Sequence, residues 1–97
     1  AASAFISFVG AVAAWKKPFI AVGDFNVRPT DCVGSEGKTA ENYARDAGIR
    51  LSAPDQPTHK QGIIDYALHS ARLNVTVTRL DLKGHPNSDH CPIYVDY

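Results

Sequence analysis

The chain has 97 residues, of which 44% are hydrophobic, and its ten basic side chains balance ten acidic ones. This length predicts one small domain or a part of a larger one, and the hydrophobic content argues against a disordered chain. A formal net charge of zero argues against a protein that binds nucleic acid by bulk charge alone, although it leaves room for a local basic groove.

Residues 3–15 predict a helix that faces the core. Apolar side chains recur there at helical spacing, with small residues between them, and the segment carries no charged side chain. A targeting or membrane segment is the alternative, but the stretch lacks a basic start and is shorter than the roughly 20 residues that a membrane span needs. We therefore expect no membrane partner, and we expect Trp15 to lie in the core.

The rest of the chain predicts strands, loops and one further helix. The continuous apolar run 19–22 is typical of a strand that is covered on both faces, whereas the alternation in 73–80 exposes one strand face to water. Together the elements predict an α/β chain of the α+β kind, a single unit over residues 1–97 with a mixed β-sheet and flanking helices. The predicted order is strand 18–22, loop 23–37, helix 38–47, extended 50–52, loop 53–61, strand 62–69, strand 73–81, loop 82–90 and strand 91–96.

The two cysteines give little information. Cys32 and Cys91 match neither a CxxC motif nor a Cys/His zinc spacing. We expect two free thiols, although the sequence alone leaves a pair open. Neither a redox compartment nor a cellular location follows from these residues.

A first group of polar residues follows the apolar strand 18–22. Asp24 comes after a glycine, in a tight turn at the carboxyl end of the strand, and Asn26 can offer an amide from the same turn. Ligands gather at the carboxyl ends of strands in open α/β sheets, which favours a functional site. Turn chemistry is an equal alternative, because Asp and Asn often bond to their own backbone.

Asp65 stands inside the apolar run 63–68. An ionised carboxylate without a partner in such a place would cost several kcal/mol, so Asp65 needs one. His90 is the attractive candidate, since a carboxylate on one ring nitrogen fixes the tautomer and raises the basicity of the other. Backbone amides or an arginine are the structural alternative.

Asp89 and His90 come just before the apolar strand 91–96. Adjacent residues of an extended segment point to opposite sides, so we expect the two side chains to do different jobs. The alternative is a neutral histidine bonded within the loop, next to an ordinary turn acid. Each polar group alone is a weak signal, and the ordered set of three is much stronger.

These residues carry a resemblance to a known family. Gly23-Asp24-Phe25-Asn26, then Ile64-Asp65-Tyr66, then Ser88-Asp89-His90-Cys91-Pro92-Ile93 resemble the endonuclease/exonuclease/phosphatase superfamily, which has the DNase I-like fold. Exonuclease III-type AP endonucleases, retrotransposon endonucleases, sphingomyelinases and inositol phosphatases share this fold. The match covers essentially the whole chain and corresponds to the C-terminal half of the family's four-layer α/β sandwich.

The resemblance implies a division of roles. Asp24 would orient or activate the attacking water and contribute to the metal site, and Asn26 would bond to that water or to the phosphate. Asp65 would orient His90, which would act as general base or as a donor to the phosphoryl oxygens. Asp89 would help to hold Mg²⁺ or Mn²⁺, the hard cations that offset charge on a phosphoryl group.

The chain also departs from the family pattern. The first half of the family supplies an asparagine, the main metal-binding glutamate and a further histidine or tyrosine, and Glu36 and Glu41 do not match that glutamate. The resemblance thus implies half a site and an open inner sheet face. A part of a longer enzyme, a complementary half, or self-association as a homodimer would each account for this.

The substrate is only weakly indicated. The resemblance implies a divalent-metal-dependent phosphodiester hydrolase, a nuclease acting on DNA rather than RNA, in which Arg28, Lys60 and Arg72 could contact phosphates. Isolated basic residues in loops are also often merely solvated. A phosphatase or phospholipase acting on a small phosphoester, or a fragment with a structural or associative role, are the alternatives. Pro57-Thr58-His59 is frequent in nuclease members, and Tyr66 is expected in the core.

Overall fold

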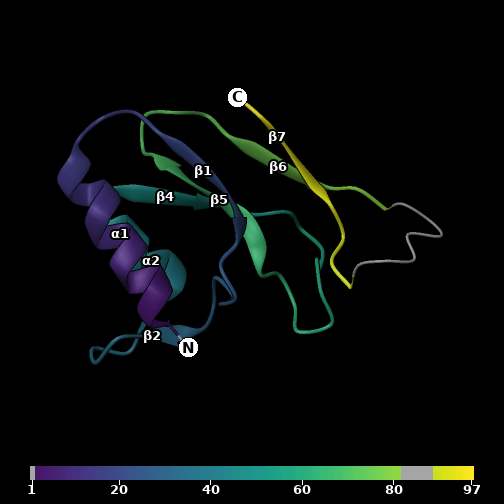
Figure 1. The fold of residues 1–97 in the computed structure, drawn as a ribbon, viewed down its shortest axis with the longest axis horizontal. Helices are drawn as coiled ribbons and strands as arrows, with labels where there is room; N and C mark the ends of the chain where they lie inside the picture. Colours follow the sequence, from purple (N-terminus) through teal and green to yellow (C-terminus); the bar gives the residue numbers. More distant parts are fainter. Residues whose placement is uncertain (1, 82–88) are drawn as a thin grey trace.

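The computed structural model describes residues 2–81 and 89–97. Figure 1 shows the two helices packed together at the end of the molecule that carries β4, with the β6–β7 hairpin toward the other end. The described elements are α1 (Ser3–Trp15), β1 (Ile20–Asp24), β2 (Cys32–Val33), β3 (Lys38–Thr39), α2 (Ala40–Asp46), β4 (Ile49–Ser52), β5 (Asp65–Ser70), β6 (Thr76–Arg79) and β7 (Ile93–Asp96).

A three-stranded sheet in the order β1–β5–β4 forms the centre of the fold, and β6 pairs with β7. The α+β class with flanking helices is therefore confirmed. The expected mixture of parallel and antiparallel pairs is not found, because every strand pair in the described part of the chain is antiparallel. In β1–β5 the register sets Gly23 opposite Tyr66 and Asp24 opposite Asp65.

Alternation along β5 decides which face of the sheet holds the core. Tyr66 and Leu68 point to one face, where they join Phe5 and Val9 of α1 and Ala44 of α2 in one buried cluster. Phe5 and Val9 are one helical turn apart, so a single stripe of α1 covers the sheet. The expectation that Tyr66 is a core residue is confirmed.

Trp15 does not lie in the core, contrary to the sequence prediction, since it is 56% exposed. At 100° per residue, position 15 lies about 120° around the helix from Val9 and so points off the buried stripe. The helix also ends there, because Lys16 takes a left-handed backbone conformation with φ 61°. The side chain therefore extends into solvent beside the end of the helix.

β1 is not covered on both faces, which corrects a second prediction. Val22 pairs with Ala67 and Asp24 with Asp65, so these four side chains share the face opposite Tyr66. Val22 is 50% exposed on that face. β1 also forms an edge of its sheet in the described structure, so its apolar sequence is not the signature of a central strand.

Several boundaries differ from the predicted ones. The predicted strand 62–69 begins only at Asp65, because His59 and Gly62 form a bridge across a turn. The predicted helix 38–47 begins at Ala40, where the Thr39 hydroxyl accepts the Asn42 N–H (3.2 Å). Most of the predicted loop 82–90 lies outside the described residues.

Two smaller expectations concern the cysteines and the membrane. Cys32 is an exposed free thiol and Cys91 a partly buried one, as expected. In the described ranges, no helix combines the length and the apolar character that crossing a bilayer requires.

Candidate active site

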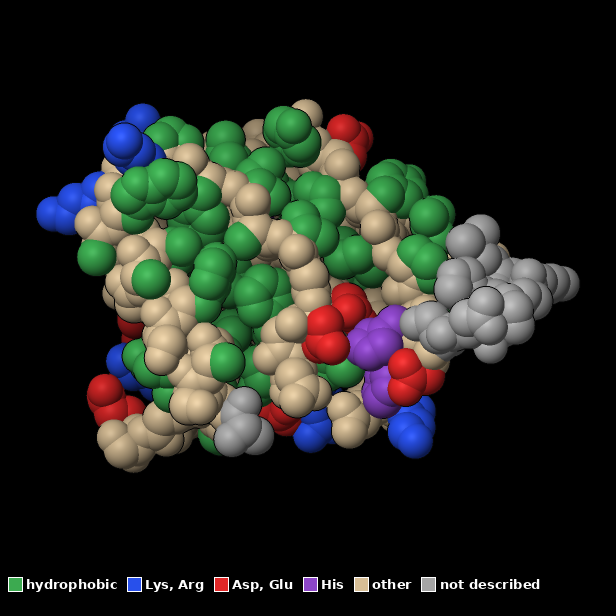
Figure 2. Space-filling model, in the orientation of Figure 1, with side chains coloured by type: hydrophobic (Ala, Val, Ile, Leu, Met, Phe, Trp, Pro, Cys, Tyr) green, Lys and Arg blue, Asp and Glu red, His purple; other side chains and the backbone are tan. Residues whose placement is uncertain are grey.

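Two carboxylates meet where the end of β1 faces the start of β5. Because the strands are antiparallel, Asp24 is the last residue of β1 and lies directly opposite Asp65, the first residue of β5. Both side chains point to the face of the sheet away from the helices. Figure 2 shows acidic and histidine side chains gathered at one point of the surface, bordered by hydrophobic ones.

The Asp65–His90 pair predicted from the sequence is present. His90 Nδ1 lies 2.7 Å from Asp65 Oδ2, and the Asp65 side chain is only 13% exposed. A carboxylate can only accept, so Nδ1 of His90 carries the proton and donates it. This hydrogen bond raises the pKa of His90; burial opposes the rise, while the charges of Asp65, Asp24 and Asp89 add to it.

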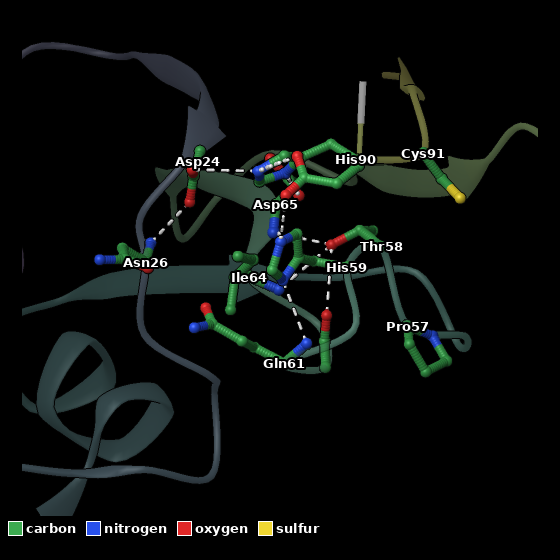
Figure 3. A network of polar contacts seen from close by, with 12 residues as sticks. Asp24, Asn26, Pro57, Thr58, His59, Gln61, Ile64, Asp65, His90 and Cys91 are labelled. Carbon is green, nitrogen blue, oxygen red and sulfur yellow. Dashed lines mark hydrogen bonds and ion pairs between the residues drawn. The ribbon is translucent and has the colours of Figure 1, made fainter. Parts of the chain in front are cut away.

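The second nitrogen of His90 faces two more carboxylates. Its Nε2 lies 3.7 Å from Asp24 Oδ2 and 3.8 Å from Asp89 Oδ1. In the neutral ring Nδ1 holds the proton and Nε2 is the acceptor, whereas in the protonated ring, which the raised pKa favours, Nε2 also carries a proton. Figure 3 shows Asp24, Asp65 and His90 converging on this point.

Asp24 also has the structural role that the sequence left open for it, a hydrogen bond within its own turn. Its Oδ1 accepts the backbone N–H of Asn26 (2.8 Å), and Asn26 takes a left-handed conformation with φ 54°. The same carboxylate thus shapes the turn with one oxygen and faces His90 with the other. A structural role in the turn and a functional role in the site are therefore compatible for Asp24.

A buried threonine connects the segments that carry Asp65 and His90. Thr58 Oγ1 accepts the backbone N–H groups of Ile64 and Asp65 (3.2 Å each), and its carbonyl accepts the N–H of Cys91 (2.7 Å). Thr58 is fully buried, so these bonds are shielded from water. Sequence reasoning did not assign Thr58 a role; the only available signal was its place in the motif Pro57-Thr58-His59.

His59 is a further member of the cluster that sequence reasoning did not place there. Its Nε2 lies 2.9 Å from Asp89 Oδ2, and its Nδ1 accepts the backbone N–H of Gln61 (3.1 Å). The Gln61 contact requires a lone pair on Nδ1, so Nε2 carries the proton and donates it to Asp89. This bond holds the pKa of Asp89 below its ordinary value.

Asp89 and His90 do not point to opposite sides, contrary to the expectation for an extended segment. Their side chains approach to 3.8 Å, and the rings of His59 and His90 lie 4.7 Å apart, centre to centre. The backbone bends at residues 89 and 90, and β7 begins only at Ile93. The alternation of a strand therefore does not apply to this pair.

The basic residues lie around the Asp–His cluster rather than in it. Asn26 and Arg28 line a neighbouring open cavity of about 350 Å³, in which the Arg28 guanidinium is paired with Asp31 (2.8 Å). Lys60 follows His59 in the turn. Arg72 lines a different cavity and makes no contribution to this site.

Two groups of donors could hold a cation. One is Asp24, Asp65 and His90, the other is His59, Asp89 and His90, and within each group the ligand atoms lie within 4.8 Å of one another. Glu36 pairs with Lys38 (3.7 Å) and Glu41 lies in the first turn of α2, so neither glutamate belongs to these groups.

No protein-family model matches the chain, and comparisons with curated proteins and with solved structures gave no match either. The family resemblance therefore depends on the three motifs, and it stays a prediction. The geometry of the site is independent of that resemblance.

Proposed function

We propose that the protein is a divalent-metal-dependent phosphodiester hydrolase, and specifically a nuclease of the DNase I-like type. The observation that carries the proposal is the hydrogen-bonded Asp65–His90 pair, whose second nitrogen faces Asp24 on the neighbouring strand. The order of the three motifs along the chain adds support from the sequence. A metal-independent structural role would not require an oriented imidazole beside three carboxylates.

The proposed reaction is attack of water on phosphorus. Asp24 Oδ2 and His90 Nε2 lie 3.7 Å apart, so one water molecule could bond to both. His90 would take the proton of that water, and Asp65 would stabilise the resulting imidazolium through Nδ1–H. In the opposite protonation state, His90 would donate to a phosphoryl oxygen. A positioned acid–base group of this kind contributes about 10²–10⁴-fold to a rate.

The carboxylates present fit Mg²⁺ or Mn²⁺. These cations prefer oxygen ligands and keep several water molecules, and the Asp24 and Asp89 carboxylates are both exposed enough to leave that space. When bound, such a cation would offset the negative charge on the phosphoryl group. Asp65 is less suited, because its Oδ2 is already bonded to His90.

Nucleic acid is the proposed substrate, with DNA favoured over RNA. Arg28 and Asn26 line the open cavity next to the cluster, where a phosphate neighbouring the scissile one could sit. Arg28 would then exchange its Asp31 contact for a phosphate, which suits a guanidinium. Because no glutamate lies in the cluster, we also propose that a complementary half or a second copy completes the metal site.

Cleavage of plasmid DNA and of bis(p-nitrophenyl) phosphate in Mg²⁺ or Mn²⁺ tests the proposal. We expect Asp65→Asn and His90→Ala to lower the rate by about 100-fold or more, because the second removes the acid–base group and the first removes the carboxylate that orients it. Asp24→Ala should act in the same way. Asp55→Asn, which changes an exposed carboxylate in the loop before Thr58, should leave the rate unchanged.

Activity that survives the His90 and Asp24 substitutions would refute the assignment. A folded sample with no metal-dependent activity on either substrate would favour the alternative, an associative or structural role. The half-exposed Val22 and Tyr94 are the observation that favours that alternative.

A further inference from the structure

Two imidazole rings flank the exposed Asp89 carboxylate. Its Oδ2 lies 2.9 Å from His59 Nε2, and its Oδ1 lies 3.8 Å from His90 Nε2. The two imidazole rings lie 4.7 Å apart, so their Nε2 atoms flank the same carboxylate from neighbouring positions. His59 takes no part in the proposed hydrolysis, so its position next to His90 calls for a separate explanation.

We propose that His59, Asp89 and His90 form a site for a borderline transition-metal ion such as Zn²⁺. Two imidazoles and one carboxylate suit Zn²⁺, which binds nitrogen and oxygen ligands, whereas Mg²⁺ favours oxygen ligands only. The ligand atoms already lie within 4.8 Å of one another, so small rotations of these three side chains would bring them into coordination. Asp89 is 71% exposed, which provides an entry path and open coordination positions.

The two histidines differ in which ring nitrogen carries the proton, and therefore in how easily each could bind a metal. His90 donates Nδ1–H to Asp65, which leaves Nε2 as the nitrogen that would bind a metal, and a carboxylate behind the ring is the usual outer partner of a metal-bound histidine. His59 carries its proton on Nε2, because Gln61 N–H occupies Nδ1. Binding therefore moves that proton to Nδ1 and breaks the Gln61 bond, which makes the site weaker than a preformed structural zinc site.

Occupation of this site would regulate the proposed hydrolase, and this consequence depends on the proposed function. A metal on His90 Nε2 removes the lone pair that would accept the proton of water. It also withdraws Asp89 from the proposed Mg²⁺ site. Zn²⁺ should therefore inhibit the Mg²⁺-supported reaction, because the Zn²⁺-bound protein can use neither His90 Nε2 as a base nor Asp89 as a Mg²⁺ ligand.

Binding is tested without any activity assay. Calorimetry with Zn²⁺ and the visible absorption of Co²⁺ should show one ion per chain, not displaced by an equal concentration of Mg²⁺. His59→Gln and Asp89→Asn should each weaken binding by at least about tenfold, since even outer-shell changes reach 10–100-fold. Asp89 is exposed, so Asp89→Asn should leave the circular dichroism spectrum unchanged and separates ligand loss from misfolding.

Two controls make the result specific. Cys91→Ser should retain Zn²⁺ binding, because Cys91 belongs to neither donor group. Asp24→Asn should also retain it, because Asp24 belongs to the other donor group. Loss of binding in Asp24→Asn together with retention in His59→Gln would overturn the proposal. Inhibition by Zn²⁺ that His59→Gln relieves supports the regulatory consequence, whereas Zn²⁺ binding in a protein without nuclease activity would refute only the proposed function.

Discussion

Among the groups around His90, Asp65 has the largest effect on its protonation state. Asp65 accepts the proton of Nδ1 at 2.7 Å, and the pKa of His90 lies above its ordinary value for that reason first. The same contact leaves Nε2 directed at Asp24. One partly buried carboxylate thereby sets the tautomer and the direction of the imidazole and contributes most to its raised pKa.

His90 should stay protonated to a higher pH in the metal-free protein than a histidine in an unfolded chain. Its folded pKa is raised from 6.5, so its contribution to stability is complete below that pH and is lost as pH rises through the folded pKa. Nuclear magnetic resonance of the ring Hε1 measures this directly. Asp65→Asn should lower the midpoint, and an unchanged midpoint would contradict the assigned contact.

Thr58 should be more important for stability than its size suggests. Thr58→Val keeps the shape but leaves the N–H groups of Ile64 and Asp65 without a partner, at a cost of about 1–3 kcal/mol for each buried donor. Thr58→Ser keeps the hydroxyl and serves as the matched control. Urea denaturation compares the two, and equal unfolding free energies would count against the role given to the hydroxyl.

At the level of elements, strand register decides which side chains meet. Asp24 and Asp65 face each other only because β1 and β5 pair in one register. A shift of one residue would turn one carboxylate toward the helices and the other away from them. The turn at residues 58–62 then brings Thr58 and His59 beside the start of β5.

Two glycine-to-alanine changes should have opposite effects. Gly62 closes the turn at φ +120°, and a Cβ there would lie 2.9 Å from Arg28 Cδ, so Gly62→Ala should destabilise the protein. Gly10 lies in α1 with open space around it, so Gly10→Ala should stabilise by about 0.5–1 kcal/mol. Thermal denaturation of both variants measures the two effects, and stabilisation by Gly62→Ala would disprove the turn argument.

For the whole molecule, the core lies on one side of the sheet. Helices α1 and α2 cover the face that holds Tyr66 and Leu68, whereas Val22 is half exposed on the opposite face. The site lies at one edge of that second face, next to Asp65. The position of the site explains why its acidic groups are accessible although the strand that carries Asp65 is mostly buried.

The sequence by itself determined most of the elements and one long-range pair, but not the short β2–β3 pair. Helical spacing in 3–15 and apolar runs at the strands follow local rules, and Asp65 required a partner because an unpaired buried carboxylate is unstable. These features predicted the α+β class and the contact with His90. They did not predict that Trp15 points off the helix stripe or that β1 has an exposed face, because both depend on what packs against each element.

Only the tertiary structure decided the remainder of the site. His59 and Asp89 are thirty residues apart, and their contact at 2.9 Å requires both the turn at 58–62 and the bend at 89–90. Nothing in the local sequence encodes the distance between two such segments, since it follows from the Thr58–Cys91 hydrogen bond and the β1–β5 register. Local pattern thus specified which residues have reactive side chains, and long-range packing specified which of them meet.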